Sequence, residues 1–109
     1  MKKYKKSESD NINYNQEIEN AINIYEKTIG HFASRTRTMI ENYGNIGALE
    51  ALMDNADIQK GFKTLRDKNM LDKTFEAIIV KYQDKITFKK EAVAVAKFRL
   101  ENPRWDEII

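Results

Sequence analysis

The amino-acid sequence predicts an all-α protein, a compact bundle of about five helices with one long N-terminal heptad-patterned helix. Apolar or semi-apolar residues recur at steps of three and four between Gln16 and Tyr43, which is the spacing of a heptad repeat. The alternation of apolar and polar residues that is typical of a strand never persists. A hydrophobic share of 41% and a charged share of 33% indicate a folded chain rather than a disordered one.

The chain length favours a single domain. Its 109 residues are enough to bury a core without disulfides or metals. We expect residues 1–15 to form a flexible basic and polar tail and residues 16–109 to form one helical domain. A helix from Gln16 to Tyr43 would be roughly 40 Å long at about 1.5 Å per residue. A helix of this length must project from the domain, bend, or pair with a partner chain.

Shorter helices are expected after the long one. Gly44 is well placed to end the first helix in the left-handed conformation, and Asn45 can cap a second helix. A third helix should begin near Gly61. Asp72 is expected to cap a fourth helix.

The fourth helix is expected to be the buried centre of the bundle. Phe75, Ile78 and Ile79 make it apolar on nearly every side, which is typical of a helix enclosed by others. Thr87 is expected to cap the last long helix, and Pro103, the only proline, closes it.

Part of this pattern is similar to one found in other proteins. The central segment reads G-F-x-x-L from Gly61 to Leu65 and L-D-x-T-x-E-x-x-x-V from Leu71 to Val80. With these motifs the chain resembles small uncharacterised bacterial all-helical proteins. The resemblance implies no activity, and the motifs themselves are explained by helix starts, caps and core positions.

The sequence lacks the residues that several kinds of reactive site require. Cysteine is absent and His31 is the only histidine, so a thiolate or multi-histidine metal site is not expected. No serine lies in a Gly-x-Ser-x-Gly turn, and no helix carries the Glu-x-x-His pair of a di-iron bundle. We therefore expect no enzyme activity, metal or cofactor. No apolar run approaches the ~20 residues of a membrane span, so a cytoplasmic protein without membrane contact is expected.

The heptad stripe and the C-terminal tail carry more apolar surface than a small domain needs, and such a surplus indicates an interface. The candidate interface residues are Ile18, Ile22, Tyr25, Ile29, Phe32 and Trp105. We expect a non-enzymatic protein–protein interaction module, that is, a small bacterial or phage accessory, adaptor or inhibitor protein. Its partner is expected to be another protein or a second copy in a homodimer.

Weak nucleic-acid binding is the alternative hypothesis. The candidate basic contact residues are Lys2, Lys3, Lys5, Lys6, Arg35 and Arg37. Such residues can contact phosphates or an acidic protein surface, but a net charge of +2 is a weak indication of nucleic-acid binding. An ordinary helix-turn-helix is not expected, because the helix that would read the bases carries large apolar side chains instead of polar ones.

Overall fold

The fold is described by a computed structural model that covers residues 2–54 and 56–107, with side chains described for residues 14–54, 60–105 and 107. Over this part of the chain the regular structure is entirely helical, which confirms the predicted all-α class. The α-helices are α1 (Lys2–Ile29), α2 (Ser34–Met53), α3 (Ala56–Asp67), α4 (Phe75–Tyr82) and α5 (Lys90–Glu101). Two short 3₁₀ segments, η1 (Leu71–Lys73) and η2 (Trp105–Glu107), complete the described structure.

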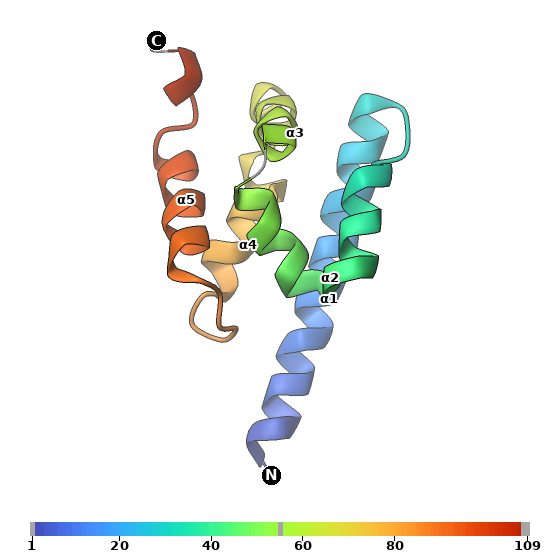
Figure 1. The fold of residues 1–109 in the computed structure, drawn as a ribbon, viewed down its shortest axis with the longest axis vertical. Helices are drawn as coiled ribbons and strands as arrows, with labels where there is room; N and C mark the ends of the chain where they lie inside the picture. Colours follow the sequence, from blue (N-terminus) through green and yellow to red (C-terminus); the bar gives the residue numbers. More distant parts are fainter. Residues whose placement is uncertain (1, 55, 108–109) are drawn as a thin grey trace.

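The long helix expected from Gln16 to Tyr43 is divided into two. Helix α1 ends at Ile29, and α2 begins at Ser34. Gly30 separates them with a φ of 83°, a conformation that glycine adopts readily and that terminates helices. The chain then reverses direction, so that α1 and the first part of α2 lie side by side as a hairpin (Figure 1). A single heptad-patterned seam through this region was therefore a wrong prediction.

The N-terminal segment, which was expected to form a flexible tail, has a helical backbone from Lys2 onward. Helix α1 starts at Lys2, so residues 2–15 belong to the same helix as residues 16–29. Tyr14 is buried, and its ring lies edge-on to Tyr82 at a centroid distance of 5.5 Å and to Phe88 at 6.0 Å. The α1 helix is thus fixed to the core at least from Tyr14 onward.

Helix α2 bends at Gly44, where the backbone has a φ of 76° and a ψ of 172°. This combination is essentially limited to glycine, so the break expected after Tyr43 is present. Asn45 was expected to cap the following helix, but its side-chain amide donates a hydrogen bond to the Asn15 side chain on α1. The bend directs the second half of α2 toward α3 and the centre of the bundle (Figure 1).

Helix α4 packs against both α1 and α5. Ile78 and Ile79 are buried as expected, whereas Phe75 is only partly buried at the edge of the core. The N-cap of α4 is Thr74 rather than Asp72: its hydroxyl accepts a hydrogen bond from the Ala77 amide at 3.2 Å. It also donates one to the Leu71 carbonyl at 2.7 Å.

A charged pair lies inside the apolar core. Arg99 on α5 donates to the Glu76 carboxylate on α4 at 2.8 Å, and it also donates to the Met53 carbonyl at 3.2 Å. Glu76 is fully buried, and its second carboxylate oxygen has no hydrogen-bond partner. Burial raises the pKa of Glu76, against the opposing effect of the Arg99 guanidinium. This pair joins α2, α4 and α5 at one point.

Replacing Arg99 with methionine should therefore destabilise the fold by ~3–5 kcal/mol near neutral pH, because it leaves the Glu76 charge buried and unpaired. Loss of the guanidinium raises the folded-state pKa of Glu76 further above the unfolded value, so the folded variant binds a proton that the unfolded chain does not. The stability of Arg99→Met should consequently rise as the pH falls from 8 to 5, relative to the unaltered protein. Urea unfolding across this pH range measures the difference.

The double variant Glu76→Leu/Arg99→Met is the control. It should recover most of the lost stability and lose the extra pH dependence, since no buried charge remains. A single variant that unfolds at the same urea concentration as the unaltered protein at every pH would contradict the assignment.

Candidate functional site

An apolar pocket lies between the α1–α2 turn, α3 and the start of α4. Its volume is about 270 Å³. Helix α1 supplies one wall with Ile22, Tyr25 and Ile29, and α3 supplies the opposite wall with Phe62 and Leu65. Large apolar walls of this kind are what ligand and side-chain binding sites share.

The α3 wall is supported from behind by aromatic packing. The Phe62 ring lies 5.5 Å from the Trp105 ring between centroids, and Trp105 in turn lies 6.0 Å from Phe98. Gly61 approaches Tyr25 closely: a Cβ at this glycine would lie 3.7 Å from the tyrosine ring, at van der Waals contact. Partial burial raises the pKa of the Tyr25 phenol.

Phe32 stands at the mouth of the pocket. It belongs to the turn between α1 and α2, and 76% of its surface is exposed to solvent. A phenylalanine with this exposure leaves a large apolar area in water beside the apolar lining of the pocket.

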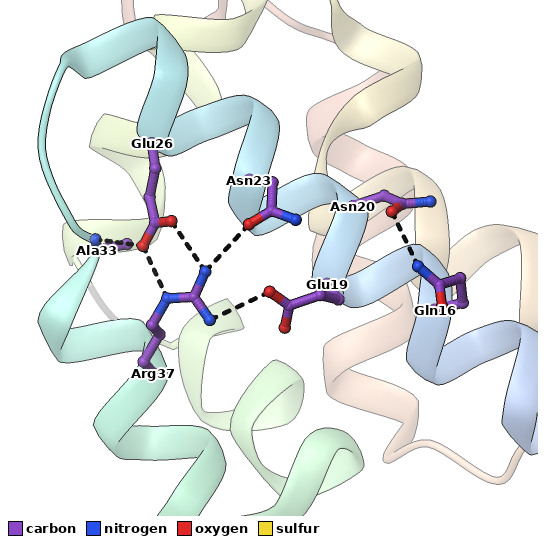
Figure 2. Close-up of polar contacts among 7 residues, drawn as sticks. All are labelled: Gln16, Glu19, Asn20, Asn23, Glu26, Ala33 and Arg37. Atoms are coloured by element: carbon purple, nitrogen blue, oxygen red, sulfur yellow. Dashed lines mark hydrogen bonds and ion pairs between the residues drawn. The ribbon is translucent and has the colours of Figure 1, made fainter.

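The turn that carries Phe32 is held by one carboxylate. Glu26 accepts hydrogen bonds from the Ala33 amide at 2.8 Å and from two nitrogens of the Arg37 guanidinium, each at 2.8 Å. Arg37 also donates to Glu19 and Asn23, both at 3.2 Å. Figure 2 shows these contacts converging on Arg37 from one face of α1. We call Glu26, Arg37 and the Ala33 amide the turn clasp.

The ion pair between Arg37 and Glu26 strongly favours the ionised form of the Glu26 carboxyl group. Hydrogen bonds from Arg37 lower the pKa of Glu26 to about 2, with a further contribution from the Ala33 amide. Only 12% of the Glu26 side-chain surface is exposed, against 35% for Arg37, so the carboxylate is better shielded from water than its partner. Because Glu26 lies near the end of α1 and bonds to Ala33 and Arg37 at the start of α2, the turn clasp joins the two helix ends.

The rim of the pocket is basic. His31, Arg35, Lys60 and Lys73 contribute to its lining from the turn, α2, α3 and η1 respectively. Among the described lining residues Glu76 is the only acid, and its carboxylate is fully buried and paired with Arg99. Lys60 and Lys73 are exposed, and Lys73 lies 3.7 Å from Asp72.

The candidate interface residues are separated by the fold. Ile18 and Ile22 are each only 1% exposed, because α4, α5 and the second half of α2 contribute to the same core cluster. Both therefore belong to the core, and Ile22 also lines the pocket. Tyr25, Ile29 and Phe32 line the same pocket. Trp105 lies behind its α3 wall rather than on a separate surface.

The candidate basic residues are likewise divided. Arg35 lies on the pocket rim, whereas Arg37 is engaged by the turn clasp. The side chains of Lys2, Lys3, Lys5 and Lys6 lie outside the described residues. Sequence reasoning did not identify Glu26, Lys60, Phe62 or Lys73 as site residues. The chain reverses at Gly30, and the uninterrupted heptad spacing gave no sign of this reversal. Sequence reasoning therefore could not place the α1–α2 turn beside α3 and η1.

The described residues hold neither a metal-binding cluster nor a membrane-spanning helix. They contain no group of three or more His, Cys, Asp or Glu residues placed to hold a metal ion. In the same residues no helix has the length and apolar character to cross a membrane. In comparisons with known proteins, no family model, curated protein or solved structure matches the chain.

The turn clasp leads to a pH-dependent prediction. Glu26→Gln should lower stability at pH 7 by ~1–2 kcal/mol, a value reduced because Arg37 is partly exposed. The folded pKa of Glu26 is depressed, so its contribution is complete above the unfolded pKa and is lost as the pH falls toward about 2. The difference between the variant and the unaltered protein should therefore shrink as urea unfolding is repeated at lower pH.

Glu41→Gln provides a matched control, because Glu41 is an exposed glutamate on α2 that lies outside the clasp. It should leave stability nearly unchanged at pH 7. If the two substitutions have equal effects at that pH, the clasp does not hold the turn.

Proposed function

We propose that this chain is a non-enzymatic protein–protein interaction module, an accessory, adaptor or inhibitor protein that receives apolar side chains of a partner in the pocket beside Phe32. The observation that carries the proposal is the 76% exposure of Phe32 at the mouth of an apolar pocket of about 270 Å³. Aromatic residues that adjoin pockets are frequent anchors of protein interfaces. A cytoplasmic location remains a prediction of the sequence.

The size of the pocket supports a side-chain anchor over a cofactor. Its volume of about 270 Å³ is slightly below the ~300–1,000 Å³ of sites that enclose drug-sized molecules. A partner that inserts one or two large side chains would fill it, while Phe32 would pack against the partner outside the pocket. The turn clasp supports this arrangement, because a fixed turn loses little conformational entropy on binding.

The charge of the rim favours a different protein over a second copy. In a twofold dimer the same patch meets itself, so Lys60 and Lys73 of one chain would approach the same residues of the other. Like charges brought together at an interface weaken association. The homodimer expected from the sequence is therefore the less supported form of this proposal.

Nucleic-acid binding remains the alternative. Arg37 is already bonded to Glu26, Glu19 and Asn23, so a phosphate would have to compete with the turn clasp for it. The rim cations Lys60 and Lys73 surround an apolar pocket, whereas a nucleic-acid backbone is bound by a continuous basic stripe. The geometry consequently favours a protein partner.

Affinity capture from the cells that produce the protein tests the proposal. Phe32→Ser should reduce the amount of captured partner at least tenfold, because it removes an exposed anchor without altering the core. Tyr43→Ser is the matched control, since Tyr43 is another large exposed side chain, at 62%, and does not line the pocket. Both variants should keep the melting temperature of the unaltered protein.

Equal capture by the two variants would show that the pocket is not the interface. Light scattering on the purified protein at tens of micromolar then distinguishes self-association: a dimer that Phe32→Ser converts to a monomer would favour the second copy as the partner.

A further inference from the structure

The two halves of α2 differ in how deeply they are buried. The first half, residues 34–43, has no fully buried side chain, and it packs against the core through the partly buried Met39 and Ile40. Figure 1 shows this half at the edge of the molecule, beside α1. The buried side chains of α2 all follow Gly44: Ala48, Leu49, Leu52 and Met53. A helical segment with few buried apolar contacts separates from its neighbours at a lower free energy than a core helix does.

A glycine with a left-handed backbone lies at each end of this segment and its preceding turn. Gly30 has a φ of 83° and Gly44 a φ of 76°. A Cβ at either position would meet no atom within 4 Å, so neighbouring groups do not restrict the backbone there. Hinges are short positions of this kind that absorb a change in φ and ψ while the helices beside them stay intact. Residues 31–43 therefore have a possible hinge at both ends.

The same residues form one side of the apolar pocket. Residues 31–36 all contribute to its lining, opposite Phe62 and Leu65 on α3. Phe32 at the pocket mouth belongs to this segment. A rotation about Gly30 and Gly44 would therefore move one side of the pocket relative to the other and widen its entrance.

Polar contacts to α1 hold the segment in place. Arg37 donates to Glu26, Glu19 and Asn23, as Figure 2 shows, and the Ala33 amide also donates to Glu26. The side chains of Arg37 and Glu19 are 35% and 50% exposed, so water reaches these contacts and can replace them when they break. Such contacts are strong enough to favour one position of the segment and weak enough to open reversibly.

We propose that residues 31–43 form a lid that turns on Gly30 and Gly44 and is held closed by the turn clasp. The lid opens to admit a bulky side chain into the pocket and closes again over it. The motion belongs to the chain alone, whereas the nature of what enters rests on the proposed function. The closed form is the one described above, and the open form is a minor state of about 0.1–10%.

Distances between two spin labels measure the motion directly. The chain has no cysteine, so labels attach only where cysteine is introduced. Glu41→Cys/Lys97→Cys places one label on the lid and one on α5, and Asp54→Cys/Lys97→Cys places both outside the lid; all three positions are exposed. Pulsed electron paramagnetic resonance on the full chain then gives the distribution of distances for each pair.

Arg37→Gln should raise the population at a second distance about tenfold for the lid pair, because it removes several hydrogen bonds of the closed form only. The pair outside the lid should keep a single distance. Arg104→Gln is the matched control, since Arg104 makes an exposed ion pair with Glu107 at 2.9 Å, away from the lid. It should add no second distance. The circular dichroism of Arg37→Gln should equal that of the unaltered protein, because the lid moves as an intact helix.

The hinge is tested by a second pair of variants. Gly44→Ala should also populate a second distance for the lid pair, because alanine disfavours the positive φ at this position. Gly61→Ala is its control: the added Cβ would lie at an ordinary contact distance of 3.7 Å, and the lid should stay closed.

The opposing outcomes are distinct. A single unchanged distance in Arg37→Gln overturns the lid and leaves the pocket as the proposed interface. A second distance accompanied by a loss of helicity also overturns it, because the segment then unfolds instead of turning. The same second distance for the pair outside the lid shows that all of α2 moves. Equal partner capture by Phe32→Ser and Tyr43→Ser, in contrast, removes the proposed function without affecting the lid.

Discussion

The arrangement at the top of the bundle depends on the Glu26 carboxylate. Gly30 permits the chain to leave α1, but a flexible residue does not by itself decide where the next helix starts. Ala33 at the start of α2 has no side chain that can cap the helix, and Glu26 accepts the hydrogen bond of its amide instead. The same carboxylate holds Arg37 one turn further along α2. One side chain of α1 thus supplies both the cap and the anchor of its neighbour.

The buried pair of Glu76 and Arg99 has a comparable role at the centre of the molecule. It connects α4 and α5 directly and reaches α2 through the Met53 carbonyl. A buried ion pair adds little net stability compared with apolar residues of the same shape, yet it requires one relative placement of the helices that carry it. The pair also keeps the Glu76 carboxylate away from solvent inside the core.

The sequence was sufficient for the helical class, because apolar spacing of three and four residues reports directly on helices. It was misleading at Gly30, since Phe32, Thr36 and Met39 keep the heptad spacing across the turn. Ile18 and Ile22 were therefore assigned to an external interface, although the chain itself buries them. Glu26 and Arg37 become neighbours only after the reversal, so a pattern of residues along one helix could not identify the clasp or the pocket that it borders.

The burial of α1 by the later helices has a consequence for the order in which the chain folds. The hydrogen bond between Glu17 and Tyr82 joins residues 65 positions apart, and the core around Ile18 and Ile22 includes Ile79 and Ala92. During synthesis α1 precedes α4 and α5. Its apolar face therefore stays partly exposed to solvent until these later helices are made and can pack against it. The α1–α2 hairpin and the α4–α5 pair are local units that can form early, while their mutual docking closes a long loop and comes late. The apolar face of α1 is thus most exposed to misassociation until α4 and α5 dock on it.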